Sequence, residues 1–173
     1  QGAARGNAEP RAAAADVTAA VQAAVDGRAP VLVKLSPNVA DLASIARAVA
    51  AAGADGLSAI NTLTGMVIDV DARRPILANR TGGLSGPAIR PLAIRCVYEI
   101  YRAVDLPIVG MGGVRSGRDA VEMIMAGATA VGVGSAVYGE GPGAFGRIRD
   151  EMVALMAELG YERPAEMRGV AHR

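Results

Sequence analysis

Two short glycine-rich turns, Gly110 to Gly113 and Gly132 to Ser135, are well suited to binding a phosphate group. Each turn follows an apolar run typical of a strand, and a helix is predicted to begin near Ser116, after the first turn. Glycines let an anion approach the backbone closely, and a helix start presents free N–H groups and a positive dipole end. One such turn often only reverses the chain. Two of them at successive strand ends predict a phosphate-bearing ligand.

A third glycine segment, Gly82 to Gly86 (GGLSG), lies just before another predicted helix. By itself it is equally compatible with a mobile lid. Beside the other two turns, we interpret it as a phosphate contact or as a lid that also contacts phosphate. We expect Arg80 and Arg90, which flank this segment, to be solvated surface charges.

Lys34 lies inside the apolar run VLVKL, where burying an unpaired ammonium group would be costly. The position therefore predicts an anionic partner, although a lysine on an edge strand can instead reach solvent. Asn61 and Thr62 follow the next predicted strand and suit a small polar substrate, but they are equally able to cap the loop that follows.

Groups for acid–base catalysis are scarce. The single histidine, His172, lies at the extreme C-terminus, so no Ser/His or Cys/His relay and no multi-histidine metal site is expected. The single cysteine, Cys96, lies in the middle of a predicted helix and is expected to be a small buried side chain. We therefore predict neither a metal site nor a general base within this chain.

The elements that position these residues alternate between strands and helices, as in parallel β/α units. Asp41 is the expected N-cap of one helix, and Gly53 and Gly160 are expected to end two others. Residues 61–86 are expected to form a long connection, and the tail is expected to contain one short helix. The predicted strands are 31–35, 57–60, 107–110 and 130–134, and the predicted helices are 12–26, 41–52, 87–104, 119–126 and 142–159.

Four β/α units can form a small open sheet or half of a closed barrel. The polar residues and glycine turns fall at the ends of the strands, where α/β barrels carry their chemistry, so we predict a (β/α)8 TIM barrel of the α/β class. Such barrels have eight strands, and we expect only the C-terminal half to be present. The chain begins with Gln1 in a loop-like stretch, which we interpret as a truncated start, so residues 1–173 would be the C-terminal portion of one domain.

Composition excludes several classes of function. The 173 residues are 51% apolar and 20% charged, which is enough apolar content for a globular core. The net charge of +1 is not gathered into a basic stripe, so nucleic acid is not an expected partner. No apolar run approaches the roughly 20 residues of a membrane-spanning helix. One cysteine cannot form an internal disulfide and fits a cytoplasmic protein.

Five segments, in this order and spacing, resemble the dihydroorotate dehydrogenase family, and most closely its NAD-linked class 1 catalytic subunits. The resemblance extends from about Pro30 to Tyr138. Each motif alone is modest, but the set is specific. The segments are VKLSPN (33–38), INTLTG (60–65), ILANRTGGLSGPAIRP (76–91), PIVGMGGV (107–114) and AVGVGSA (130–136).

This resemblance implies an FMN-containing barrel that oxidises dihydroorotate to orotate in pyrimidine synthesis. Lys34 would lie against the flavin and stabilise negative charge on the reduced cofactor, which would supply the anionic partner. Ile60 would contact FMN, and Asn61 with Thr62 would hold orotate. The remaining expected FMN contacts are Gly86, Gly112, Gly113, Gly134 and Ser135, the last four around the phosphate.

The resemblance also implies limits. The family uses a cysteine base on an SCPN-type loop, which we expect upstream of Gln1 because Cys96 cannot replace it from within a helix. The chain alone is therefore expected to be inactive. The NAD-linked type passes electrons to a partner subunit with FAD and an iron–sulfur cluster, in a homo-oligomer or heterotetramer. Alternatives are a dihydropyrimidine dehydrogenase-like FMN barrel, a non-redox phosphate-binding barrel, and a non-catalytic module that dimerises.

Overall fold

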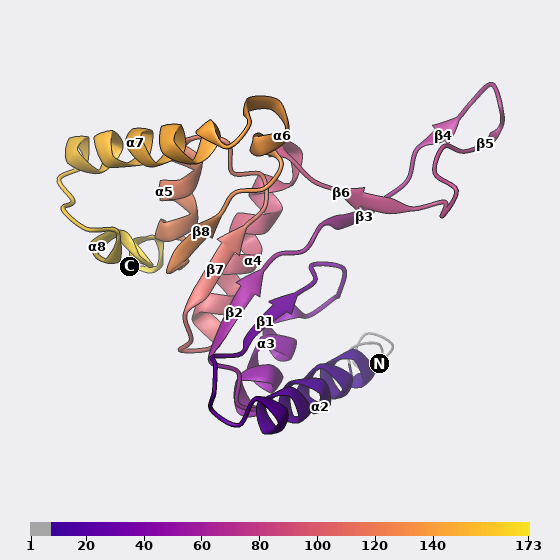
Figure 1. Cartoon of the computed structure of the whole chain (residues 1–173), viewed down its shortest axis with the longest axis horizontal. Coiled ribbons are helices and arrows are strands. Elements are labelled where there is room, and N and C mark those ends of the chain that lie inside the picture. The colour runs from indigo at the N-terminus through magenta and orange to yellow at the C-terminus, as the bar shows by residue number, and fades with distance from the viewer. Residues whose placement is uncertain (1–7) are drawn as a thin grey trace.

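A four-stranded parallel sheet forms the centre of the computed structural model, which describes residues 8–173 (Figure 1). Its strands are β1 (Leu32–Leu35), β2 (Gly56–Ala59), β7 (Ile108–Met111) and β8 (Ala130–Gly132), paired in the order β1-β2-β7-β8. All three pairings are parallel. The four predicted strands and their parallel β/α arrangement are confirmed, with boundaries that move by one or two residues.

The two faces of this sheet differ in burial because successive side chains of a strand point to opposite faces. One face carries Leu35, Leu57, Ala59 and Ile108, which are all buried. The other face carries side chains that are only partly buried or exposed, among them Leu32, Lys34, Ser58, Val109 and Met111. Only one face of the sheet is therefore covered by the described chain.

The buried face is covered by α3 (Leu42–Ala51), α4 (Arg90–Ala103) and α5 (Gly117–Met125), each of which connects two neighbouring strands. These helices present apolar residues at helical spacing, as amphipathic helices over a sheet do. Val49, Val97 and Met123 pack in one core with the strand residues. The short 3₁₀ helix η1 (Pro87–Ile89) leads into α4.

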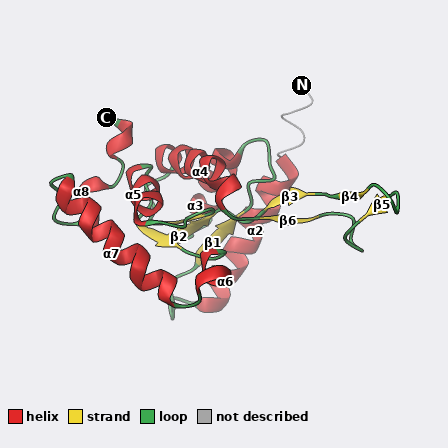
Figure 2. Cartoon of the chain, turned by 90° about the horizontal axis from the view of Figure 1, so that it is seen from above, coloured by secondary structure: helices red, strands yellow, loops and turns green. Residues whose placement is uncertain are grey.

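Further helices extend this layer at both ends (Figure 2). The helix α2 (Ala8–Val25), predicted over 12–26, packs against α3, and its Gln22 side chain donates a hydrogen bond to Asp55 at 2.9 Å. At the other end, α7 (Gly143–Glu158) and the predicted tail helix, α8 (Pro164–Met167), pack on α5 through Val121, Ile124, Met156 and Met167. The remaining elements are α6 (Ala136–Glu140) and η2 (Val170–His172).

Local capping signals place the helix ends. Asp41 accepts a hydrogen bond from the Ser44 amide at 2.9 Å and caps α3, as predicted. Ser116 and Asp119 form a capping box that fixes the start of α5. Gly53 and Gly160 both have positive φ, of 96° and 77°, beyond the ends of α3 and α7.

Residues 61–86, predicted to be a long connection, instead contain two antiparallel β-ladders. The strand β3 (Leu63–Gly65) pairs with β6 (Gly82–Leu84), and β4 (Ile68–Asp69) pairs with β5 (Arg74–Pro75). Together they form an arm that projects away from the helices (Figures 1 and 2). The expectation was wrong because strands of two or three residues show no alternation that sequence reasoning can detect.

The sheet has two edge strands, β1 and β8, and one uncovered face. This arrangement is consistent with part of an α/β barrel, in which the uncovered face would point to the interior. In residues 8–173, no helix is both long and apolar enough to cross a membrane.

Leu57 and Leu32 form a matched pair for testing which face is covered. Leu57 is 0% exposed beneath the helices, whereas Leu32 is 51% exposed on the opposite face. In the 173-residue chain, Leu57→Ala should lower the free energy of unfolding by about 2–5 kcal/mol because it opens a cavity. Leu32→Ala should change it by less than about 1 kcal/mol. Urea unfolding of both variants measures the difference, and equal losses would contradict the assignment of faces.

Candidate functional site

A cavity of about 200 Å³ opens at the carboxyl ends of the four strands. Ligands of parallel α/β proteins bind at this end of the sheet. All nine residues predicted to bind cofactor or substrate line this cavity, although they are distributed over 102 positions of the sequence. They are Lys34 from β1, Ile60, Asn61 and Thr62 after β2, Gly86 before α4, Gly112 and Gly113 after β7, and Gly134 and Ser135 after β8.

The first glycine turn has a backbone that only glycine adopts easily. Gly112 and Gly113 have φ values of 127° and 75°. A Cβ on Gly113 would lie 2.8 Å from the backbone nitrogen of Arg90, so the turn also packs tightly against the start of α4. In the described part of the chain, the N–H groups of Gly112, Gly113, Gly134 and Ser135 meet no protein acceptor. These groups are suited to bind an anion.

Lys34 lies in a different environment from the one predicted. It is exposed, because β1 is an edge strand and Lys34 points to the uncovered face of the sheet. The inference that Lys34 is buried and therefore requires an anionic partner is wrong for this chain. Its side chain nevertheless lines the cavity, and Lys34 is the only lysine among the 18 basic residues. A single lysine beside 17 arginines is a feature of the sequence that singles out Lys34 as a candidate functional residue.

Asn61 and Thr62 are fixed by backbone contacts at the end of β2. The Asn61 amide donates to the Leu35 carbonyl at 2.9 Å, so this segment continues the pairing with β1. Asn38 holds the following residues, since its Nδ2 donates to the Thr62 carbonyl at 3.0 Å and its Oδ1 accepts from the Thr64 amide at 2.9 Å. Sequence reasoning assigned Asn38 no role, although it lies in the motif VKLSPN.

Six further residues that were not among the predicted contacts also line the cavity, namely Ser85, Ile89, Met111, Val114, Gly132 and Val133. Ser85 and Met111 lie inside the motifs GGLSG and GMGGV, but only glycines of these motifs were predicted to contact the ligand. The Met111 sulfur lies 3.8 Å from the Ser58 hydroxyl on the uncovered face of the sheet. The position of Ser85 and Met111 within a glycine motif is the feature of the sequence that could have identified both residues as lining the cavity.

Arg90, expected to be a solvated surface charge, is instead part of an ion-pair network. It pairs with Asp119, and its Nε lies 3.3 Å from Glu122. Asp119 is 5% exposed and also accepts hydrogen bonds from the amides of Arg115 and Ser116, both at 2.9 Å. Asp119 thus joins the loop after the first glycine turn to the start of α4. The expectation failed because the pairing partner lies 29 residues away.

The single cysteine and histidine lie away from the cavity. Cys96 is 1% exposed within α4, as predicted, and burial raises the pKa of its thiol. The His172 ring stacks on Tyr98 with 3.8 Å between ring centroids, and its Nε2 lies 2.9 Å from the Ala126 carbonyl oxygen. Of the described residues that line the cavity, only Lys34 is ionisable. Residues 8–173 contain no group of three or more His, Cys, Asp or Glu side chains arranged to hold a metal.

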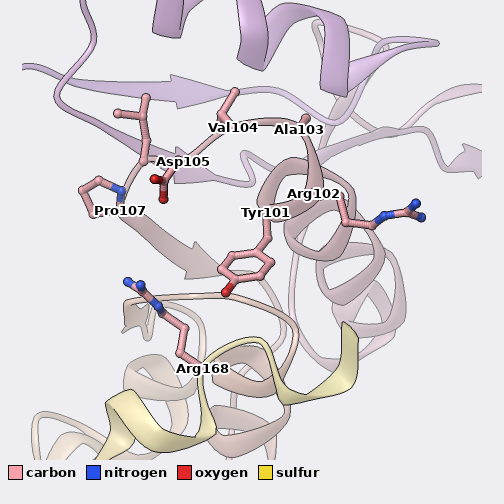
Figure 3. A pocket seen from close by; sticks show the side chains of 8 residues that line it. Tyr101, Arg102, Ala103, Val104, Asp105, Pro107 and Arg168 are labelled. Atoms are coloured by element: carbon pink, nitrogen blue, oxygen red, sulfur yellow. The ribbon is translucent and has the colours of Figure 1, made fainter. Parts of the chain in front are cut away.

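A larger cavity of about 570 Å³ lies at the opposite end of the sheet (Figure 3). Tyr101, Arg102 and Asp105 contribute to it from the end of α4 and the loop before β7, and Arg168 contributes from the C-terminal segment. It is at the amino ends of the strands, where conserved architecture in α/β barrels serves stability rather than chemistry. The smaller cavity at the carboxyl ends is therefore the candidate site.

The fold and the site define an α/β protein with a parallel sheet and, at its carboxyl edge, a cavity lined by backbone N–H groups that suit an anion. Comparison with known proteins is more specific. The sequence model of the family "Dihydroorotate dehydrogenase" matches residues 3–156. The chain therefore belongs to the dihydroorotate dehydrogenase family, as its five motifs indicated.

Curated relatives agree on one member of that family, named dihydroorotate dehydrogenase B (NAD(+)), catalytic subunit. The protein of this name from Geobacter sulfurreducens is 53% identical over 161 residues, which are 93% of this chain and 52% of that protein. Those from Desulforudis audaxviator and Methanosarcina mazei are 52% and 50% identical over 91% and 90% of the chain. The chain spans about half the length of these relatives.

Asp119 should be important for stability because it satisfies two backbone amides and pairs with Arg90. Asp119→Ala leaves the two amides without their acceptor and leaves Arg90 with only its longer contact to Glu122, so we expect a loss of about 2–4 kcal/mol in the free energy of unfolding. Asp150→Ala is the matched control, because Asp150 is exposed and, among residues 8–173, pairs only with its neighbour Arg149. It should stay within about 0.5 kcal/mol of wild type in the same urea titration. Similar values for the two variants would show that the network is not stabilising.

Proposed function

We propose that the protein to which this chain belongs oxidises dihydroorotate to orotate, with FMN bound in the cavity at the carboxyl ends of the strands. The observation that supports this most directly is the gathering of the nine family-motif residues around one cavity. The names of the relatives, which are about 50% identical over about 90% of the chain, support the same reaction.

The residues of the cavity fit FMN. The N–H groups of Gly112, Gly113, Gly134 and Ser135 would hold its phosphate, since they meet no protein acceptor in the described chain. Lys34 would place a positive charge beside the flavin ring, and Ile60, which is buried, would support it. Bound FMN would supply the hydride acceptor of the reaction.

Asn61 and Thr62 would hold the substrate by hydrogen bonds from the end of β2. Their backbone is fixed by the Leu35 carbonyl and by Asn38, so their side chains are positioned without a mobile loop. The cavity offers no carboxylate, imidazole or thiol from the described residues. We therefore assign the base that removes the substrate proton to a cysteine outside the 173 residues, and we expect the chain alone to be inactive.

A larger assembly follows from this proposal. We propose that the missing half of the relatives' length completes a (β/α)8 barrel over the uncovered face of the sheet. The relatives' names include NAD(+) and a catalytic subunit. We infer that electrons leave FMN for NAD through a partner subunit with FAD and an iron–sulfur cluster, within a cytoplasmic homo-oligomer or heterotetramer.

Lys34→Ala tests the proposed site in the full-length protein. With dihydroorotate in excess, the rate of flavin bleaching measured by stopped flow should fall by about 10²-fold, because one electrostatic stabiliser of the reduced cofactor is lost. Lys34→Arg retains the charge and should lose less. An unchanged rate in Lys34→Ala would remove this residue from the mechanism, and a full-length protein that binds no flavin would refute the proposed function.

The same position offers a measurement that needs no turnover. Lys34 is the only lysine of the 173 residues and is exposed. In the 173-residue chain, an amine-acetylating reagent followed by peptide mass spectrometry therefore reports on Lys34 selectively. FMN should slow acetylation of Lys34 while leaving the N-terminal amine unaffected. Equal rates with and without FMN would indicate that the flavin does not contact Lys34.

Gly134→Ala separates cofactor binding from folding. A Cβ on Gly134 would meet no protein atom within 4 Å, so the substitution should not disturb folding. Since Gly134 lines the cavity, the added methyl group should weaken FMN binding by roughly tenfold in a fluorescence titration. Gly139→Ala is the matched control, because its Cβ also meets no atom within 4 Å but Gly139 lies outside the cavity. Equal FMN affinities for the two variants would argue against a phosphate at the second turn.

A further inference from the structure

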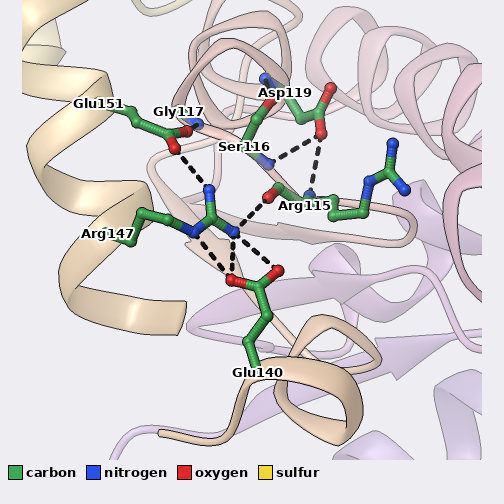
Figure 4. A network of polar contacts seen from close by, with 7 residues as sticks. All are labelled: Arg115, Ser116, Gly117, Asp119, Glu140, Arg147 and Glu151. Carbon is green, nitrogen blue, oxygen red and sulfur yellow. Dashed lines mark hydrogen bonds and ion pairs between the residues drawn. The ribbon is translucent and has the colours of Figure 1, made fainter. Parts of the chain in front are cut away.

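Arg147, near the start of α7, lies outside the cavity and yet contacts both segments that follow the glycine turns (Figure 4). Its Nε and Nη2 donate to the two carboxylate oxygens of Glu140 at 2.8 and 2.9 Å. Its Nη2 also donates to the Arg115 carbonyl at 2.9 Å, and its Nη1 donates to Glu151 at 2.5 Å. One guanidinium group thus joins three segments of the chain.

The contact with Glu140 holds the segment after the second turn. Ser135 is followed immediately by α6, a helix of five residues that ends at Glu140. Of these five residues only Ala136 is buried, and Tyr138 is 96% exposed. Apolar packing therefore fixes α6 weakly, and the bidentate pairing of Glu140 with Arg147 is its main polar attachment to the rest of the molecule.

The contacts with Arg115 and Glu151 hold the segment after the first turn. Arg115 lies two residues beyond Gly113, and its carbonyl accepts from Arg147 while its amide donates to Asp119. The other carboxylate oxygen of Glu151 accepts from the Gly117 amide, the first residue of α5, at 2.7 Å. The Gly117 amide and the Arg147 guanidinium together lower the pKa of Glu151, because both stabilise its charged form.

We infer that Arg147 is a positioning residue that fixes the two glycine turns relative to each other, so that their N–H groups converge on one phosphate. This inference rests on the proposed function, since it takes FMN phosphate as the ligand of the turns. Arg147 does not touch the ligand itself, because it does not line the cavity. Because its role concerns only the phosphate end of the flavin, substituting Arg147 should weaken binding of a phosphate-bearing flavin selectively. A general loss of stability would not be selective in this way.

Riboflavin, which is FMN without the phosphate, reveals that signature. Full-length apoprotein is titrated with FMN and with riboflavin, following flavin fluorescence, in wild type, Arg147→Gln and Arg149→Gln. Arg149 lies two residues further along α7, is exposed, and in the described part of the chain pairs only with its neighbour Asp150, so it is a matched control. Thermal unfolding of each apoprotein records stability separately.

Wild type should bind FMN more tightly than riboflavin. Arg147→Gln should lose roughly tenfold in FMN affinity, the loss expected from one charge-assisted hydrogen bond on a binding loop, while its riboflavin affinity stays unchanged. Arg149→Gln should match wild type for both ligands. An Arg147→Gln variant that matches Arg149→Gln, or that loses equally for both flavins, overturns the inference.

A second variant keeps the inference testable if Arg147→Gln does not fold. Glu140→Gln leaves the Arg115 and Glu151 contacts of Arg147 in place and weakens only the attachment of α6, so it should lose a few-fold in FMN affinity and none in riboflavin affinity. No selective loss in Glu140→Gln overturns the inference in that case. Wild-type protein that binds neither flavin refutes the proposed function itself, whereas wild type that prefers FMN without sensitivity at Arg147 or Glu140 refutes only the positioning role.

Discussion

The parallel pairing of β1, β2, β7 and β8 is the constraint on which the rest of the structure depends. Parallel strands place all of their carboxyl ends at one edge, so whatever follows each strand must gather there. Lys34, Asn61, Gly112 and Gly134 are far apart in the sequence but line one cavity for this reason. Each strand contributes only three or four residues. A small sheet of four short strands is therefore enough to bring four loops together.

The sheet is asymmetric, and this asymmetry separates stability from binding. Its covered face is filled by side chains such as Leu57, Ile108 and Met123, which form one core with α3, α4 and α5. On the opposite face, Lys34 is exposed and Met111 is half-buried, and both line the cavity. Within the strands, the residues that stabilise the fold and those that line the cavity thus lie on different faces of the sheet. In a closed barrel the second set would become interior.

Sequence reasoning predicted the parts of this molecule that local signals determine. Asp41 and Ser116 mark helix starts through contacts three residues away, and the glycine turns are visible as motifs. It failed where the deciding partner is distant in the chain. Arg90 pairs with Asp119 across 29 positions, and Leu63 pairs with Leu84 across the arm. The prediction that Lys34 is buried failed for another reason. Its strand lies at the edge of the sheet, so a lysine within an apolar run is exposed there.

The candidate phosphate site consists of backbone N–H groups rather than of cationic side chains, although the chain has 17 arginines. A flexible arginine can adjust to its ligand, but backbone amides bind well only when the turns that carry them are already in place. Two arginines beside the turns, Arg90 and Arg147, are placed to meet that requirement. Arg90 pairs with Asp119 on one side of the first turn, and Arg147 pairs with Glu140 and Glu151 on the other. Both arginines pair with carboxylates outside the cavity, and we infer that they act on the site only by holding its neutral backbone amides in position.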